Sequence, residues 1–423
     1  TNDLKRRLEE HNSGKNILFV THGGPARMMI AGALLKTEEE VMEDEASDHT
    51  EMYLKNAEIK KLDLHLVPRD EIGAVNLHRP YIDEIELEIN GKTYKRILDV
   101  FDCWFESGSM PFASLHYPFE NKEIFDNNYP ADFIAEGLDQ TRGWFYSLIN
   151  LGVGLFDKAP YRHVIVNGMI LAGSGKKMSK SESNFTDPMD LVNKFGADAL
   201  RYFLLSSPVV RGENTEFDDA SVGEVYKKII MRLENVLQLF VMNKGENLES
   251  SSSSKNILDT WIISRLNEII REATNGYENY ELDIATRGVE KFVDDLSVWY
   301  VRRSRERLKG DSGEENWKES LQTLSFVLFE LSKVIAPVMP FIAERIYKQV
   351  CGEKESVHLE KWPIAGEINE SLIREMQDVR DVVSVGLMKR TESKQNVKQP
   401  LSSITIKKNT PEIYFSLIID ELN

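Results

Sequence analysis

Three lysines, two serines and one methionine stand together at residues 176–181, in the stretch KKMSKS. Mobile ammonium groups gathered at one point of a chain with a formal net charge of −17 can neutralise the phosphates of a nucleotide. The stretch follows Gly173 and Gly175, and the β-type run HVIVNGMIL at 163–171 precedes it. A loop in this setting can close over a polyphosphate and reopen. The alternative interpretation of this lysine loop, residues 173–184, is a solvated basic surface.

The lysine loop is not a Walker A motif. That motif requires a glycine five positions before the second glycine, and Ile170 stands five positions before Gly175. Downstream, Asp187 offers an N-cap and Pro188 suits the first position of a helix. The sequence therefore predicts a strand, a loop and then a helix beginning at Pro188.

The elements around this loop divide the chain into four segments. Strands, turns and helices alternate over residues 66–215, which favours an α/β domain with a parallel sheet. Over residues 216–405 apolar residues recur at three- and four-residue spacing, which predicts an antiparallel helical bundle. Residues 1–65 read as a strand, a turn and a helix with a closing strand, and residues 406–423 begin a further region.

The composition, 41% hydrophobic and 29% charged, is that of an ordinary globular protein. No apolar run approaches the roughly 20 residues of a membrane helix, so no membrane partner is expected. Cys103 and Cys351 stand too far apart for a zinc knuckle, and two cysteines indicate a reducing cytoplasm without a disulfide framework. We predict no metal site and no obligate protein partner. The acidic balance argues against indiscriminate nucleic-acid binding but leaves room for a local basic surface.

Several stretches resemble one enzyme family. Residues 177–181, KMSKS, resemble the signature loop of the class I aminoacyl-tRNA synthetases. The stretches DVFDCWFESGSMPFASLHYPFEN and FIAEGLDQTRGWFYSL resemble the isoleucyl-tRNA synthetase branch of that class. The same branch is matched by LHRPYIDEI, WIISRLN, DLSVWYVRRSRERL and VKQPL. The resemblance spans about residues 76–405.

This resemblance implies a fold and a reaction. The fold is an α/β Rossmann-type catalytic half-domain with a parallel sheet, followed by an all-α anticodon-binding helical bundle. The reaction is the charging of tRNA(Ile) with isoleucine through isoleucyl-adenylate, with ATP and Mg²⁺. Ammonium groups at the phosphates would stabilise the charge that builds in the transition state, with Lys180 first and Lys177 second in that role. The ATP-binding residues implied are Lys177, Met178, Ser179, Lys180, Ser181 and Gly168.

A second set of residues is implied for the aminoacyl-adenylate. Trp104 and Trp144 match two tryptophans that flank the isoleucine side chain, and rigid aromatic rings suit a branched aliphatic group. Taken alone, each could be an ordinary core tryptophan. The polar contacts implied are Glu136, Gly137, Asp139 and Gln140. The spacing of the three polar side chains predicts one face of a helix, and without the resemblance they would read as a helix surface.

Two departures from the family pattern limit the prediction. The second family signature, two histidines flanking an Ile-Gly pair, is absent from the sequence. We therefore expect the chain to be a C-terminal fragment, which lacks the N-terminal catalytic half and the editing domain and does not adenylate isoleucine alone. Asn167 stands where many members carry histidine, which places one auxiliary contact near the nucleotide in doubt.

Residues 1–65 carry a different resemblance. The stretch ILFVTHGGPARMMIAGALL is similar to the C-terminal part of a histidine phosphatase of the phosphoglycerate-mutase-like superfamily. His22 would then match a phosphate-binding histidine of that α/β fold. The alternative is a strand-turn-helix in which His22 packs locally. We interpret the segment as a partial insertion in the synthetase.

The helical region carries a run of basic residues. Arg302, Arg303 and Arg305 stand on one predicted helix, and in the family this bundle binds the anticodon stem and loop. A solvated face with interleaved Glu306 is the alternative. For the chain as a whole the competing hypothesis is a phosphatase fused to a degenerate, RNA-binding synthetase module. Isoleucine-dependent pyrophosphate exchange would separate the two hypotheses.

Overall fold

The computed structural model describes residues 86–98, 103–172, 187–245, 248–350, 354–397, 399–406 and 410–422, with the single positions 30, 79 and 83. The chain forms two compact units, residues 1–101 and 102–423. In the first unit β1 (Glu86–Ile89) and β2 (Lys92–Lys95) form an antiparallel hairpin. Both turn residues, Asn90 and Gly91, have positive φ angles of 53° and 72°, as a type I′ turn requires. Apart from Ile30, the predicted phosphatase-like segment with His22 lies outside the described residues.

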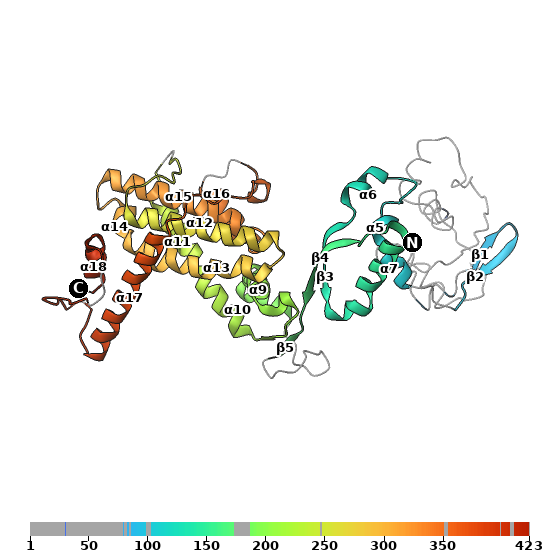
Figure 1. Cartoon of the computed structure of the whole chain (residues 1–423), viewed down its shortest axis with the longest axis horizontal. Coiled ribbons are helices and arrows are strands. Elements are labelled where there is room, and N and C mark those ends of the chain that lie inside the picture. The colour runs from blue at the N-terminus through green and yellow to red at the C-terminus, as the bar shows by residue number, and fades with distance from the viewer. Residues whose placement is uncertain are drawn as a thin grey trace, which may run out of the picture. The chain divides into compact units, whose positions relative to one another are not determined.

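Two parallel strands joined by a helical crossover organise residues 103–172 (Figure 1). The elements here are α4 (Cys103–Gly108), α5 (Met110–Ala113), α6 (Lys122–Asn128), β3 (Ala131–Gly137), η2 (Leu138–Arg142), α7 (Trp144–Phe156) and β4 (Tyr161–Asn167). The register of β3 and β4 runs from Ala131 opposite Tyr161 to Gly137 opposite Asn167. Phe145 and Leu148 of α7 are buried with Ile134 of β3. The crossover helix therefore packs on the strand pair, as parallel connections demand.

A second, smaller strand pair follows. Its part of the chain contains β5 (Ile170–Ala172), α8 (Pro188–Phe195), α9 (Ala197–Ser206), the 3-10 helix η4 (Pro208–Arg211) and β6 (Thr215–Phe217). β5 and β6 are parallel. Leu191 of α8, Ala199 of α9 and Phe217 of β6 share a small buried cluster, against which Ile170 of β5 packs. The lysine loop joins β5 to α8, so its two flanking elements belong to one packed unit.

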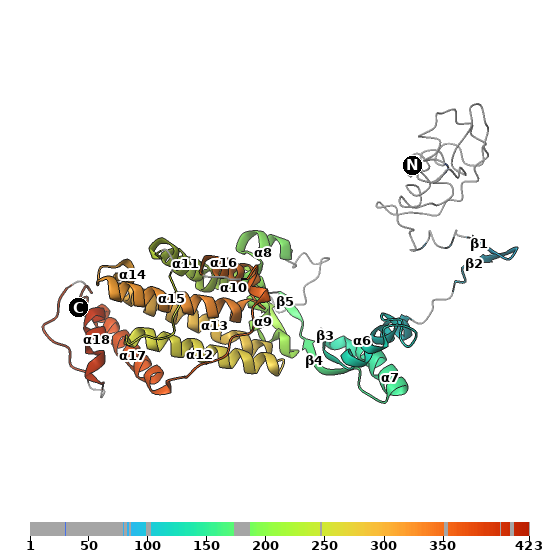
Figure 2. The ribbon, with the colours of Figure 1, turned by 90° about the horizontal axis from the view of Figure 1, so that it is seen from above.

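The rest of the described chain is a helical bundle. Its elements are α10 (Asp219–Val225), the π-helix η5 (Tyr226–Ile230), α11 (Met231–Asn243), α12 (Ile257–Glu278), α13 (Leu282–Asp294), the π-helix η6 (Asp295–Val301), α14 (Arg305–Lys309), α15 (Glu314–Ile335), α16 (Pro340–Val350), η7 (Val357–Leu359), α17 (Glu370–Glu392), η8 (Glu412–Tyr414) and α18 (Phe415–Leu422). Helix α12 lies beside both α13 and α15 (Figure 2). A Cβ at Gly276 of α12 would lie 2.5 Å from the backbone nitrogen of Ala285, so this glycine permits a close crossing of α12 and α13. One continuous hydrophobic core extends from Tyr202 of α9 to Leu422 of α18.

Helix α9 is hydrogen-bonded to the turn between α15 and α16. The guanidinium of Arg201 donates to the carbonyl oxygens of Pro337 and Val338, both at 2.9 Å. Asp198, buried at 6% exposure, accepts from the backbone N–H of Ile342 at 2.7 Å and so caps the start of α16. Burial raises the pKa of Asp198, against the lowering effect of these backbone hydrogen bonds. The pair fixes the α8–α9 unit to the bundle.

The structure confirms the predicted fold class. Parallel strand pairs with a helical crossover precede a helical bundle, and the stretch APVMPFIAERIY lies in the bundle core, with Met339, Ala343 and Tyr347 fully buried. Helix α17 also lies within the segment 216–405 that was predicted to be helical. The bounds of the four proposed segments remain predictions.

Candidate functional site

The lysine loop itself lies outside the described residues. Lys177, Met178, Ser179, Lys180 and Ser181 all belong to the interval 173–186, and only its two flanks are described. On the downstream flank, Asp187 Oδ1 accepts a hydrogen bond from the backbone N–H of Met189 at 2.8 Å, and Pro188 is the first residue of α8. The predicted cap and helix start are therefore confirmed.

The two candidate tryptophans lie close together. The indole N–H of Trp144 donates to the carbonyl oxygen of Ser107 in α4 at 2.9 Å, so the first residue of α7 is fixed against α4. A Cβ at Gly143 would lie 2.9 Å from the Trp104 ring. Gly143 therefore allows the Trp104 ring to approach the start of α7. The Trp104 side chain stays 47% exposed, which leaves part of its surface for a ligand.

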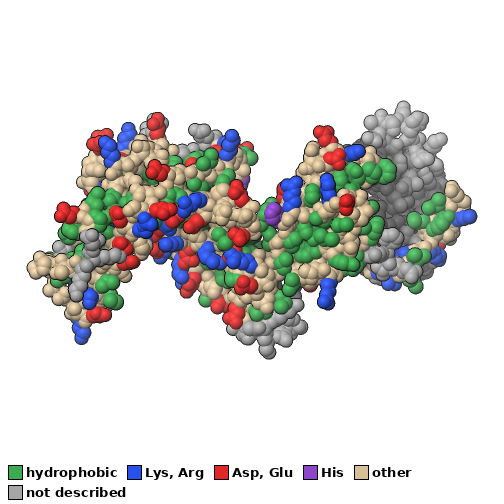
Figure 3. Space-filling view, in the orientation of Figure 1, with side chains coloured by type: hydrophobic (Ala, Val, Ile, Leu, Met, Phe, Trp, Pro, Cys, Tyr) green, Lys and Arg blue, Asp and Glu red, His purple; other side chains and the backbone are tan. Residues whose placement is uncertain are grey.

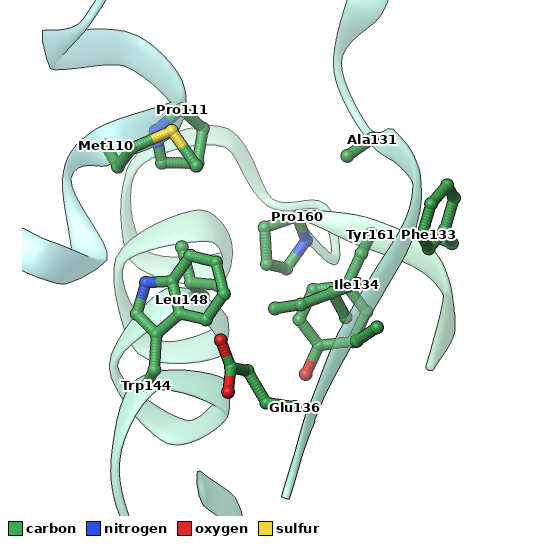
Figure 4. Close-up of a pocket in the computed structure, with 11 residues that line it drawn as sticks. Met110, Pro111, Ala131, Phe133, Ile134, Glu136, Trp144, Leu148, Pro160 and Tyr161 are labelled. Atoms are coloured by element: carbon green, nitrogen blue, oxygen red, sulfur yellow. The ribbon is translucent and has the colours of Figure 1, made fainter. Parts of the chain in front are cut away.

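A cavity of about 330 Å³ opens beside Trp144. Figure 4 shows Trp144 and Leu148 of α7 facing Ile134 and Glu136 of β3 across it, with Met110 and Pro111 at one side. The wall is mostly hydrocarbon and carries one carboxylate, that of Glu136. An apolar cavity with one charged group suits a small ligand that has an aliphatic part and a polar or cationic part.

Sequence reasoning missed most of the cavity lining. Ile134, Leu148 and Tyr161 are apolar or aromatic residues of β3, α7 and β4, which sequence patterns mark only as core. The period-two alternation of a strand, applied to FIAEG, would have placed Ile134 and Glu136 on one face of β3. Burial raises the pKa of Tyr161, so its phenol stays protonated over the neutral range.

The expectation of one helical face for Glu136, Asp139 and Gln140 is wrong. Glu136 lies in β3, Gly137 is extended with φ −72° and ψ 162°, and Asp139 and Gln140 lie in the short 3-10 helix η2. Pairing of β3 with β4 overrides the helical spacing, because strand hydrogen bonds to Val166 and Asn167 continue through this stretch. The three side chains therefore follow one another around a strand-to-helix corner.

Gln140 has a local structural role at that corner. Its side-chain oxygen accepts from the backbone N–H of Trp144 at 2.9 Å, and its amide nitrogen donates to Asp139 Oδ2 at 3.1 Å. The first bond satisfies an N–H group that the start of α7 would leave without an intrahelical partner. A Cβ at Gly137 would lie 2.6 Å from Asp139 Oδ1, so the exposed Asp139 side chain would have to move if residue 137 carried one.

Among the described residues, no group of three or more His, Cys, Asp or Glu side chains is placed to hold a metal ion. None of the helices in the described ranges is long and apolar enough to cross a membrane.

Two family models match this chain. Residues 33–216 match the family model of tRNA synthetases class I (I, L, M and V), and residues 259–406 match that of the anticodon-binding domain of tRNA ligase. The isoleucine–tRNA ligase of Protochlamydia amoebophila (strain UWE25) is 43% identical over 365 residues, which cover 82% of this chain and 35% of that protein. Residues 33–216 belong to the class I tRNA synthetase family, and residues 259–406 to the anticodon-binding domain family.

Two further relatives fit this family. The isoleucine–tRNA ligase of Chlamydia trachomatis serovar D is 43% identical over 367 residues, 82% of this chain and 35% of that protein. The leucyl-tRNA synthetase of Agrobacterium radiobacter K84, solved with tRNA and LeuAMS, shares the fold with a TM-score of 0.51 and 21% identity, covering 68% of this chain and 36% of that one. The chain thus spans about a third of the length of these relatives. The synthetase match begins at residue 33, inside the segment 1–65 whose phosphatase-like resemblance stays a prediction.

The three arginines predicted to bind tRNA lie in the part that matches the anticodon-binding domain, and their surroundings differ. Arg302 donates to Glu421 at 2.7 Å, and Arg303 donates to Asp420 at 2.7 Å and to Glu421 at 3.2 Å. Both acidic residues belong to α18, so these two arginines hold α18 against the bundle. Arg305 is exposed and no ion pair is found for it within the described ranges. Their contact with tRNA remains a prediction.

Proposed function

We propose that the chain serves the charging of tRNA(Ile) with isoleucine, through isoleucyl-adenylate formed from ATP. The observation that carries this proposal is the cavity beside Trp144, with Trp104 close by and Glu136 in its wall, in a chain 43% identical over most of its length to isoleucine–tRNA ligases. The apolar wall would receive the branched side chain of isoleucine. Glu136, Gly137, Asp139 and Gln140 would face the polar part of the adenylate.

The chemistry is the attack of the isoleucine carboxylate on the α-phosphorus of ATP. A carboxylate oxygen–phosphorus bond forms, and the bond to the departing pyrophosphate breaks. Lys180, and second Lys177, would stabilise the negative charge that grows on the phosphate oxygens. Met178, Ser179, Ser181 and Gly168 would complete the ATP-binding surface. Mg²⁺ would enter with the ATP phosphates, as this ion usually does.

The remaining assignments follow from the same proposal. Residues 66–215 would supply one half of the catalytic domain, residues 216–405 would bind the anticodon arm of tRNA(Ile), and residues 406–423 would begin a further region. Arg302, Arg303 and Arg305 are candidates for contact with tRNA. The cytoplasm is the compartment in which this reaction would take place.

The decisive experiment is isoleucine-dependent exchange of pyrophosphate into ATP, measured on the complete gene product. Lys180→Ala should lower kcat of exchange by at least roughly 100-fold, since it removes a charge aimed at the transition state. Trp104→Ala should raise the KM for isoleucine and should change the KM for ATP less. Absence of isoleucine-dependent exchange in the wild-type protein would overturn the proposal.

A further inference from the structure

A buried carboxylate holds two arginines from different elements at the bundle surface. Asp283, in the first turn of α13, is 0% exposed. Its Oδ1 accepts from Nε of Arg211 at 2.7 Å, and its Oδ2 accepts from Nη2 of Arg287, also at 2.7 Å. Arg211 is the last residue of η4, and Arg287 follows Asp283 by one helical turn. One carboxylate therefore fixes the direction of both guanidinium groups.

Both guanidinium groups keep hydrogen-bond donors for a ligand. The side chains are 44% exposed at Arg211 and 64% exposed at Arg287. A guanidinium carries five N–H donors, and Asp283 takes one from each. No other ion pair of either arginine is found in the described part of the chain. The guanidinium groups of Arg211 and Arg287 carry two positive charges and the Asp283 carboxylate carries one negative charge. The three groups together therefore have a net charge of +1, and the two guanidinium groups face solvent.

Beyond this pair, the surface along α13 is of mixed charge. Lys291 follows Arg287 by one further turn, is exposed, and lines a polar cavity of about 340 Å³ together with Arg380 of α17. The wall of that cavity also carries the carboxylates of Asp294, Asp295 and Asp381. Figure 3 shows Lys and Arg side chains gathered over this part of the bundle, with acidic side chains among them. The acidic neighbours are Glu224 and Glu290, which contact Lys228, and Asp294, which pairs with Arg232 and Arg380. Arg211 and Arg287 differ from these pairs because their shared anion is buried beneath them.

We propose that Arg211 and Arg287 together bind a phosphate of the RNA backbone. A phosphodiester presents two oxygens that accept paired N–H donors from guanidinium groups. Since Asp283 already holds both side chains, binding costs less rotamer entropy than it would for two free arginines. This inference rests on the proposed function, in which tRNA is the ligand. It places a phosphate contact on the α13 face, whereas Arg302 and Arg303 donate to acids of α18.

Binding of a tRNA(Ile) transcript to this chain, measured by fluorescence anisotropy over a range of salt concentrations, tests the proposal. Arg211→Gln and Arg287→Gln remove the charge but keep an amide donor for Asp283. Each should weaken binding roughly tenfold, the effect of losing one charge-assisted contact. Each should also reduce the steepness of log K against log salt by roughly 0.7 to 0.9. An unrelated tRNA should lose affinity by the same factor, because phosphate contacts carry no sequence information.

Arg374→Gln is the matched control. Arg374 is 74% exposed on α17 beside Glu370, so its loss removes the same charge from another face, and affinity and salt slope should stay unchanged. Arg287→Lys, which keeps the charge but loses the planar fork, should retain the salt slope and lose part of the affinity. Urea unfolding shows whether each variant keeps the wild-type fold. Folded Gln variants that bind tRNA with unchanged affinity and slope would overturn this site and leave the proposed function intact. A wild-type chain that binds no tRNA would overturn both the site and the assigned anticodon-arm binding, whereas isoleucine-dependent exchange reports on the catalytic proposal separately.

Discussion

The α-carbon of Gly168 lies directly against the backbone of Glu213, and a Cβ at position 168 would come within 2.0 Å of the Glu213 carbonyl oxygen. The N–H of Gly168 also donates to the carbonyl oxygen of Val209 at 2.7 Å. Glycine is therefore required where the β4–β5 junction crosses the chain between η4 and β6. This requirement is structural, and it holds beside any contact of Gly168 with ATP.

Gly168→Ala should lower the free energy of unfolding by about 1 to 3 kcal/mol, because backbone rather than a flexible side chain must move. Gly154→Ala is the matched control, since a Cβ at this exposed position of α7 meets no atom within 4 Å. That change should raise the free energy of unfolding by up to about 1 kcal/mol through helix propensity. Urea unfolding measures both variants, and equal effects would contradict the assigned contact.

Gln140→Ala should remove the side-chain cap of α7 and lower the free energy of unfolding by about 1 kcal/mol. Gln140→Glu keeps an oxygen acceptor for the Trp144 N–H but replaces the donor to Asp139 by a second carboxylate, so it should recover only part of the stability. Thermal unfolding compares the two variants. If Trp144 lines the isoleucine site, Gln140→Ala should also raise the KM for isoleucine in the complete gene product. A Gln140→Ala variant as stable as the wild type would mean that the hydrogen bond to Trp144 contributes nothing.

Arg307→Ala should be among the most damaging changes in the bundle. Its guanidinium donates to both carboxylate oxygens of Asp259, at 2.9 and 2.8 Å, and Asp259 is fully buried. Truncation leaves that charge without its ionic partner, which costs about 3 to 5 kcal/mol. Arg305→Ala, two residues away and exposed, should change stability by less than about 0.5 kcal/mol. Urea unfolding tests the contrast, and comparable losses at the two positions would refute the buried pair.

The carboxyl group of Asp218 should make the stability of the fold depend on pH. Its carboxylate caps α10 by accepting from the backbone N–H of Ser221 at 2.7 Å, and hydrogen bonds from the backbone and the side chain of Ser221 hold the pKa of Asp218 below its usual 3.8. A carboxyl whose pKa is lower in the folded state stabilises the fold above its unfolded pKa and loses that contribution as pH falls.

Asp218→Asn keeps the capping oxygen and removes the titration. The wild type should therefore be more stable than this variant at pH 6, by up to about 1 kcal/mol, and the difference should shrink as pH falls from about 5 toward 3. Unfolding curves at several pH values measure it. A difference that is constant over this range would show that the charge of Asp218 has no part in the cap.

Local patterns in the sequence were sufficient for some features of this fold. The helix start at Asp187 and Pro188 was predictable because the cap, the proline and the helix are neighbours in the chain. The corner at Glu136 was not, since pairing with β4, some thirty residues later, decides between strand and helix there. Sequence spacing reports local preference, and tertiary pairing overrides it.

The arginine run at 302–307 shows the same limit for side chains. Adjacent arginines look alike in the sequence, yet Arg307 is buried on Asp259, Arg303 pairs with Asp420, and Arg305 is exposed. The surroundings of Arg303 and Arg307 depend on partners that are far away in the sequence. The tryptophans came to notice only through family resemblance, because neither composition nor periodicity distinguishes a ligand-facing tryptophan from a core one.

The residues on either side of the interval 173–186 belong to one packed unit formed by β5, β6 and α8. Ala172, on one side, ends β5, which pairs with β6, and Leu191 of α8, on the other, shares a buried cluster with Phe217 of β6. Hydrogen bonds of Arg201 and Asp198 then connect that cluster to the turn before α16 and to the start of α16. The separation of Ala172 and Asp187, the described residues on either side of the interval, is thus a fixed dimension of the framework. A substitution at Phe217 that weakens the packing of the cluster would change the distance between the two ends of the interval without altering any lysine.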